Sequence, residues 1–227
     1  MLETLKSLEK LNANWGYSRE VGSWNIELIG CNSDEPEKRF QNLIDTLNKI
    51  IPPLKKLHTL EQADFDLAVL GEAITEKGRI EEKESEFLEF AELKASNLDE
   101  VVLAFEKLSL SYSRFIIPRI SMDLGTKIKT ENREFICPNS AELYISTDSD
   151  AIVGKKDEIY VSYSTYIDVW LNETLENRVL KNNTEYAKLN YPRLEEFLLT
   201  LEKNLGGSFE KGESYNYSDR LQRIGFA

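Results

Sequence analysis

Residues 158–170, EIYVSYSTYIDVW, can be read with two periods that lead to different structures. As a helix, the stretch would place Tyr160, Tyr163 and Tyr166 on one face. Composition favours a strand, because Ile, Val, Thr and Tyr dominate and all of them suit extended backbone. We therefore predict a strand, with a bend because a strand of this length is unusual.

The predicted strand has two different faces. One face begins with Ile159 and Val161, and we expect it to pack in the hydrophobic core. The other face carries Tyr160, Ser162, Ser164, Tyr166, Asp168 and Trp170. Tyr and Trp give large, rigid contact area and Ser gives adaptable hydrogen bonds, so this second face has the composition of a contact surface. The alternative is that a helix, predicted over 192–205, covers it.

Towards the N-terminus, the sequence pattern alternates between strand and helix. Strands are predicted at 23–30, 63–75, 80–93 and 112–124, and helices at 2–11, 33–51 and 97–108. From residue 23 onward the order is βαββαβ, which is the ferredoxin-like pattern. The range 80–93 also has a helical alternative, and we choose a strand that pairs back across a turn at 76–79.

Prolines set limits on several of these elements. Pro52 and Pro53 should end the helix over 33–51, since proline lacks the hydrogen-bonding NH and clashes with the preceding turn. Pro118 should push the strand over 112–124 towards a sheet edge or a bulge. Pro192 suits the first turn of the helix over 192–205, which the glycines that follow would stop.

Together these elements predict an α+β protein with mixed or antiparallel sheets and amphipathic helices. The 227 residues are enough for one large domain or two small ones. We divide the chain into an α+β half at 1–124, which includes an acidic segment at 61–110, and a β-rich half at 125–227 closed by the helix over 192–205. A single domain is the alternative.

Negative charge is concentrated in the segment 61–110. It carries 14 acidic and 5 basic side chains, a net −9 out of −12 for the whole chain. This sign disfavours nucleic-acid binding, which needs positive charge along the phosphates. The negative charge is compatible with a solvent-exposed surface, or with a basic partner whose association it accelerates by electrostatic attraction. We expect a cytoplasmic protein without a membrane span, because no apolar run is long enough and the two cysteines are far apart.

Residues for common catalytic sites are scarce. His58 is the single histidine, without a glycine-framed Ser or Cys beside it, and we predict that it lies at an exposed rim. The sequence lacks zinc-ligand spacing, glycine-rich phosphate loops and a nucleophile elbow. We therefore expect no cofactor and no metal, and we lean against catalysis. Arg220 and Arg223 are candidates for binding a carboxylate or a phosphate, but we expect them to pair with acids of the segment 61–110, because the chain has excess acid.

Two functions from different classes fit these observations. The first is a non-catalytic acidic binding protein that occludes a basic protein partner by shape and charge. Immunity proteins, which neutralise basic toxins, offer an analogy of composition without a shared motif. The candidate contact residues are Glu81, Glu82, Glu84, Glu86, Tyr160, Tyr166 and Trp170.

The second function is an enzyme or small-ligand-binding protein with a cleft beside the sheet, since buried carboxylates and tyrosines can do acid–base work. Its candidates are Asp64, Asp66, Asp148, Asp150, Arg220 and the tyrosines. A pocket that gathers them would favour this function, whereas a flat acidic face would favour the first. The aromatic strand is also a candidate interface for a homo-oligomer.

Overall fold

The computed structural model describes residues 3–4, 14–29, 36–69, 87–92, 94–109, 115–146, 158–176 and 179–226. These residues form three helices, an eight-stranded sheet and a two-stranded sheet. The helices are α1 (Pro36–Leu57), α2 (Leu98–Ser109) and α3 (Thr184–Leu205). The strands are β1 (Glu3–Thr4), β2 (Tyr17–Ile29), β3 (His58–Val69), β4 (Phe87–Glu92), β5 (Phe115–Lys129), β6 (Glu134–Ser146), β7 (Glu158–Ile167), β8 (Glu173–Glu176), β9 (Val179–Asn182) and β10 (Glu210–Lys211). The α+β prediction is confirmed.

Strands of the large sheet follow the order β10-β2-β7-β6-β5-β3-β4, with antiparallel pairs throughout, and β1 adds to β6 in parallel. Strand β4 pairs back onto β3, so the strand reading of 80–93 is confirmed for the described part. Strands from both sides of residue 124 share this one sheet, and residue 124 itself lies inside β5.

The pairing of the first half differs from the ferredoxin-like pattern that we predicted. The order from β2 to β5 is βαββαβ, as expected, and β3 pairs with β4 and β5. Strand β2, however, pairs with β7 and β10. The long hairpin β6–β7 lies between β2 and β5 in the same sheet, so the first and last strands of the βαββαβ order are not neighbours as they are in a ferredoxin-like sheet.

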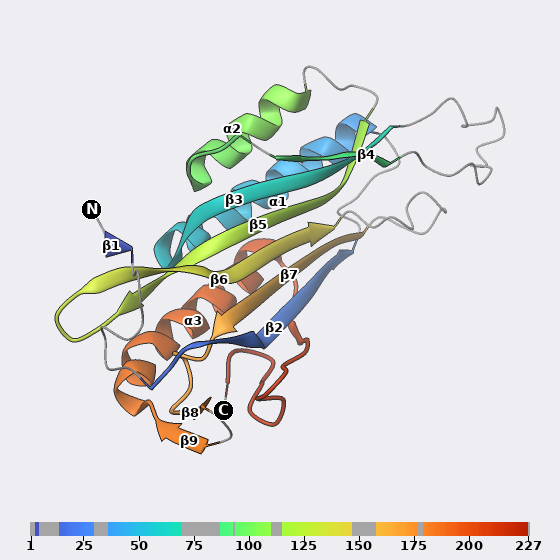
Figure 1. The fold of residues 1–227 in the computed structure, drawn as a ribbon. Coiled ribbons are helices and arrows are strands. Elements are labelled where there is room, and N and C mark those ends of the chain that lie inside the picture. The colour runs from blue at the N-terminus through green and yellow to red at the C-terminus, as the bar shows by residue number, and fades with distance from the viewer. Residues whose placement is uncertain are drawn as a thin grey trace.

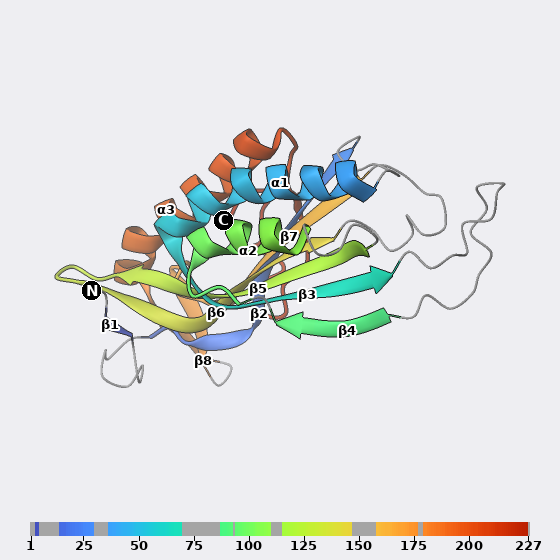
Figure 2. The same ribbon diagram turned by 90° about the horizontal axis from the view of Figure 1, so that it is seen from above.

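Helices α1, α2 and α3 lie together on one side of the large sheet (Figure 1 and Figure 2). The core fills the space between them, because apolar side chains alternate with polar ones along the strands and face the helices. Strand β7 shows the alternation clearly, with Ile159, Val161 and Tyr163 buried. No helix among the described elements covers the other side of the sheet. This side of the sheet is described in the next subsection.

Helix α1 continues through Pro52 and Pro53 to Leu57, so the predicted stop was wrong. Proline at position 53 leaves the carbonyl of Lys49 without its helical NH donor. The side chain of Asn204 on α3 donates to that carbonyl at 3.0 Å. A contact from a distant part of the chain therefore satisfies a carbonyl that the proline leaves free, and burial of the apolar face holds the last turn in place.

Helix α3 begins at Thr184, eight residues before the predicted start, and Pro192 lies inside it. The earlier turns are fixed by Asn190, whose amide donates to the Lys129 carbonyl and whose oxygen accepts from the Lys129 NH. Gly206 ends the helix with φ 78°, the left-handed conformation that glycine adopts without strain, as predicted.

Two other predictions have clear outcomes. Residues 3–4 form a strand beside β6, so the helix predicted over 2–11 is wrong where the structure describes it. Pro118 lies at a register shift between β5 and β3, opposite the interval from Asp66 to Ala68, which confirms the predicted bulge.

Among the described residues, no helix is long and apolar enough to cross a membrane.

Candidate functional site

We call the side of the large sheet opposite the helices the open face. Its described members include Glu20, Ser23, Asn25, Glu27, Gln62, Asp64, Ser121, Asp123, Glu142, Tyr144, Ser146, Tyr160, Ser162, Ser164 and Tyr166. They alternate along the strands with buried core residues, and they come from five adjacent strands. The face is therefore built of tyrosine, small polar residues and carboxylates.

The row on β7 is the part of the open face that the sequence predicted. Tyr160, Ser162, Ser164 and Tyr166 are half-buried, while the residues between them are fully buried. The predicted strand and its two faces are thus confirmed up to Ile167. The predicted cover does not lie on this row, because Phe197 of α3 packs against Tyr163 on the other side of the sheet.

Trp170 does not belong to the open face, contrary to the prediction. The strand ends at Ile167, and the NH of Leu171 donates to the carbonyl of Asp168 at 3.1 Å, which closes a turn. The turn places Trp170 in the core with 1% of its surface exposed, and its indole NH donates to Thr165 Oγ1 at 3.0 Å. Asp168 is also buried and accepts from the Tyr217 hydroxyl at 2.8 Å.

Hydroxyl groups of the open face hold two carboxylates in fixed positions. Glu142 accepts from Ser121 Oγ at 2.9 Å and from the Tyr166 hydroxyl at 2.7 Å. Glu20 accepts from Ser164 Oγ at 2.6 Å. Burial, the hydrogen bond to Glu142 and the nearby negative charges all raise the pKa of Tyr166, so this hydroxyl stays protonated and remains a donor.

Like charges gather where β3, β5 and β6 run side by side. Asp123 lies directly opposite Glu142 in the β5–β6 register, and Asp64 lies opposite Ser121, two residues before Asp123. Burial raises the pKa of Asp123, and the charges of Glu142 and Asp64 raise it further. Asp123, on the middle strand of the three, is therefore repelled by both Glu142 and Asp64.

Asp64 is the most buried of these carboxylates, with 8% of its surface exposed. Its Oδ2 accepts from Gln62 Nε2 at 2.9 Å, but its Oδ1 has no hydrogen-bond partner. A buried carboxylate oxygen without a donor is costly, so this atom is an exception that calls for a reason.

The ion pairs of the described residues lie away from the carboxylates of the open face. The described ion pairs are Lys55–Asp99, Lys56–Glu196, Arg193–Glu134, Arg220–Glu173 and Arg223–Glu202. None of these pairs, which cover only the part of the chain that the structure describes, involves a carboxylate of the open face. Within the part of the chain that the structure describes, the carboxylates of the face therefore have no basic partner.

Neutralising Asp123 should stabilise the fold. We expect Asp123→Asn to raise the free energy of unfolding at pH 7 by about 0.3–1 kcal/mol, because a charge opposite Glu142 is removed and the group is largely exposed to solvent screening. The folded-state pKa of Asp123 is raised, so the repulsion develops as the pH rises through that pKa and disappears in acid. Urea unfolding of the variant and of the unmodified protein, at pH 7 and in acid, measures how much stability the substitution adds at each pH.

The control for this variant is Glu195→Gln, which removes one charge from the exposed surface of α3. It corrects for the general effect of making the net charge of −12 less negative by one unit. Equal stabilisation by Asp123→Asn and Glu195→Gln would show that the carboxylates of the open face do not repel one another specifically.

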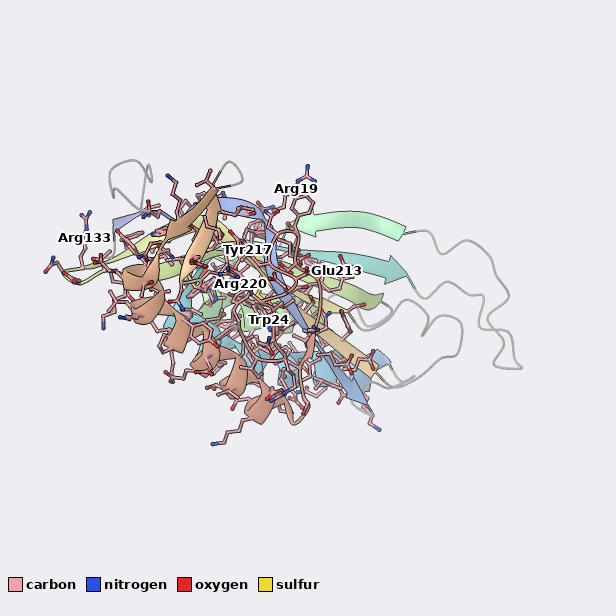
Figure 3. All side chains as sticks on the ribbon, turned by 90° about the horizontal axis from the view of Figure 1, so that it is seen from below. Arg19, Trp24, Arg133, Glu213, Tyr217 and Arg220 are labelled. Atoms are coloured by element: carbon pink, nitrogen blue, oxygen red, sulfur yellow. The ribbon has the colours of Figure 1, made fainter. Side chains whose placement is uncertain are left out.

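The residues proposed for a catalytic cleft do not converge where the structure describes them. Arg220 pairs with Glu173 at 3.0 Å in the C-terminal region (Figure 3). The residues that follow Arg220 pack against β2. Asp64 is on β3, which is four strand-to-strand steps from β2, or about 19 Å at the usual spacing between strands. The side chain of Asp66 lies outside the described residues, as do Asp148 and Asp150.

The two C-terminal arginines make intramolecular ion pairs, as expected, but with other partners than predicted. Arg220 pairs with Glu173, and Arg223 pairs with Glu202 on α3. The acids predicted as contacts on the segment 61–110, Glu81, Glu82, Glu84 and Glu86, lie outside the described residues.

His58 is buried, contrary to the predicted exposed rim. It is the first residue of β3, directly after α1, and only 1% of its surface is exposed. Its Nδ1 lies 3.3 Å from Thr126 Oγ1 and its Nε2 lies 3.2 Å from the Tyr163 hydroxyl. Burial, together with the charges of Lys127 and Arg193, lowers the pKa of His58 to about 3. The imidazole is therefore a neutral core residue with both nitrogens partnered.

In the part of the chain that the structure describes, neither the pocket nor a group of possible metal ligands marks a site on the open face. Among the described residues, no group of three or more His, Cys, Asp or Glu is arranged to hold a metal ion. A shallow pocket lies between α1 and α3, on the helix side of the sheet, and it includes Pro53, Lys56, Arg193 and Phe197. None of the open-face residues lines this pocket.

Sequence reasoning missed the carboxylates of the open face other than Asp64. Asp123 and Glu142 each alternate with buried apolar residues, in the stretches ISMDL and AELYI. This period of two is the signal that could have placed them on the polar side of a strand. It could not show that the two strands pair with Asp123 opposite Glu142.

Comparison of the chain with protein-family models, with curated proteins and with solved structures finds no match.

Proposed function

We propose that this protein is a non-catalytic binding protein whose open face occludes a basic protein partner. The observation that carries the proposal is the open face itself, a sheet surface that no described helix covers. On it, half-buried tyrosines and serines of β7 adjoin carboxylates that make no ion pair among the described residues. Tyrosine supplies rigid contact area, and serine and carboxylate supply hydrogen-bond acceptors for a polar partner. An immunity-type inhibitor of a basic toxin is the class that fits this chemistry.

Charge favours a basic partner over a second copy of the chain. The whole chain has a net charge of −12, and the carboxylates of the open face are not paired within the described residues. Two open faces brought together would place like charges opposite each other, which costs several kcal/mol. A basic surface would instead relieve the repulsion that the face carries alone. Association should therefore be fast at low salt and slower as salt screens the field.

The test is a capture experiment with a substitution at the centre of the open face. Ser162→Arg adds a bulky positive charge to the β7 row, between strands β6 and β2. We expect the unmodified protein to retain one stoichiometric basic protein from a native cell extract at about 50 mM salt and to release it at about 500 mM salt. Ser162→Arg should retain at most a tenth as much, because it blocks and repels a basic partner.

Ser208→Arg is the matched control, since it makes the same change at an exposed position after α3. It should bind the partner as the unmodified protein does. Equal retention by Ser162→Arg and Ser208→Arg would show that the open face is not the binding surface. Mass spectrometry identifies the retained protein, and an acidic or neutral partner would contradict the proposed charge complementarity.

A further inference from the structure

The C-terminal residues cover one edge of the large sheet. We call residues 207–226 the C-terminal strap. Its strand β10 pairs antiparallel with β2 and is the last described strand on this side of the sheet. The strap then continues along β2, where the NH of Gly212 donates to the Ser23 carbonyl at 2.8 Å and the NH of Ser23 donates to the Glu213 carbonyl at 3.0 Å. Both backbone groups of Ser23 that point out of the edge are therefore occupied by the chain's own C-terminal residues.

Large side chains of the strap pack against the helix side of β2. The ring of Phe226 lies 5.4 Å from that of Trp24, and the indole NH of Trp24 donates to the Gln222 carbonyl at 3.0 Å. Release of the strap would therefore expose apolar surface of β2 together with its free backbone groups. The large strap side chains that are at most 5% exposed are Phe209, Tyr217, Leu221 and Phe226.

An uncovered β2 has the properties of a strand that pairs with its own copy. An edge strand with free NH and C=O groups is a template for another strand. The part of β2 that follows its bulge is regular and is held by β7 along the other edge. If two copies pair antiparallel about Asn25, Ser23 of one lies opposite Glu27 of the other, and Trp24 lies opposite Ile26. This register places no two carboxylates opposite each other and brings apolar residues together on the helix side.

We propose that the C-terminal strap is an autoinhibitory element: it keeps the chain monomeric by occupying the β2 edge, and its release makes that edge a pairing site for a second copy of the chain. The two copies would form one continuous sheet across a two-fold axis. This inference goes beyond the proposed function and does not rest on it, since that function concerns the open face and a basic protein. The two associations also differ in salt dependence. Two chains of net charge −12 repel each other, so salt should strengthen their pairing.

The test is a full-length variant whose strap can be freed or locked. It combines Ser23→Cys and Gly212→Cys with Cys31→Ser, which removes a competing thiol. A Cβ at position 212 would lie 3.2 Å from that of Ser23 and too close to its hydroxyl, so the reduced variant should hold the strap less tightly. Oxidation at low protein concentration should close a disulfide that locks the strap on β2, because bridged cysteines have Cβ atoms about 3.5–4.5 Å apart.

We expect the reduced variant to dimerise and the oxidised variant to stay monomeric, as measured by light scattering over a concentration series. Only molecules with a released strap can pair, so freeing the strap should tighten dimerisation by at least about a hundredfold relative to the unmodified protein. Hydrogen exchange should show the amides at positions 23 and 25 exposed in the dilute reduced variant and protected again in the dimer.

Glu27→Pro tests whether the contact is the β2 edge. The NH groups of alternate residues point to the same edge of a strand, so the NH of Glu27 points outward as that of Ser23 does. Glu27 lies beyond the two residues with which β10 pairs. Proline at this position lacks the NH that a second strand needs and is tolerated at an edge. Added to the reduced variant, Glu27→Pro should restore the monomer.

A reduced variant whose strap is released, as shown by hydrogen exchange, but which stays monomeric would overturn the inference. Dimerisation that persists after oxidation or with Glu27→Pro would do so too, because the contact would then lie elsewhere. Melting curves check folding. Gly22→Ala replaces a reduced variant that is unfolded, since the atoms nearest to its methyl are side-chain ends of Leu221 and Phe226, at 2.8 Å. All these variants leave the β7 row intact, so their failure would not affect the proposed function.

Discussion

Trp24→Ala is expected to lower the free energy of unfolding by about 3–5 kcal/mol, as large-to-small changes of a buried aromatic residue do. Trp24 is fully buried on the helix side of β2. Its ring lies 6.1 Å from that of Tyr163 on β7 and 5.4 Å from that of Phe226 near the C-terminus. Figure 3 shows its central position. Alanine would leave a cavity at the point where the sheet meets the C-terminal residues.

The effect of this substitution should extend to the C-terminal residues. The indole NH of Trp24 donates to the carbonyl of Gln222 at 3.0 Å. Gly22 on the same strand is packed so closely that a Cβ there would lie 2.8 Å from Leu221 and from Phe226. Residues 221–226 are therefore docked on β2, and we expect Trp24→Ala to increase proteolytic cleavage after residue 206 under native conditions.

Urea unfolding and limited proteolysis measure these two effects. Trp24→Phe should cost less than Trp24→Ala, because it keeps most of the packing and loses the hydrogen bond to Gln222. The control is Tyr215→Ala, which removes an aromatic ring that is 63% exposed and should change stability by less than about 1 kcal/mol. A loss below about 1 kcal/mol for Trp24→Ala would show that Trp24 does not join the C-terminal residues to the core.

Local pattern predicted the elements of this fold better than their partners. The alternation in residues 158–167 was sufficient to place Tyr160 and Tyr166 on one face and the core wall on the other. The pattern could not place β2 beside β7, because strand pairing depends on contacts between residues that are far apart in sequence. The ferredoxin-like pairing was wrong for this reason.

Errors at the ends of elements have tertiary causes. Pro53 does not stop α1, since Asn204 on α3 donates to the Lys49 carbonyl that the proline leaves free. Trp170 leaves the strand pattern because a turn closed at Asp168 moves it into the core. Both outcomes depend on residues outside the local window, so propensity and period alone could not give them.

Candidate site residues were predicted where one strand contained them. The sequence indicated a binding face with tyrosine and serine on β7, but it located the acidic component only in the segment 61–110. The structure adds Asp123 and Glu142, whose closeness is a property of the β5–β6 register. A charge cluster assembled across strands has no signature in a single stretch of sequence.

Acidification should destabilise the folded protein through His58. The pKa of His58 is about 3 in the fold, because the imidazole is buried and near Lys127 and Arg193, and about 6.5 in an unfolded chain. Between these values the unfolded chain binds a proton that the folded chain does not, so stability rises with pH. The contribution is complete above the unfolded pKa and is lost as the pH falls. From about pH 7 to about pH 5 the expected loss is about 2 kcal/mol.

His58→Gln isolates this effect, since His58 is the only histidine in the sequence. The variant should be less stable than the unmodified protein at pH 7 by about 1–3 kcal/mol, because the hydrogen bonds to Thr126 and Tyr163 are changed. The difference should shrink by about 2 kcal/mol at about pH 5. Carboxylates whose pKa is raised in the fold, such as Asp123, make the protein less stable as the pH rises. Their contribution is the same in both proteins, so it cancels in the difference between the two unfolding free energies. A difference in urea unfolding that does not vary with pH would show that the imidazole can take up a proton in the fold, and hence that it is not enclosed in the core.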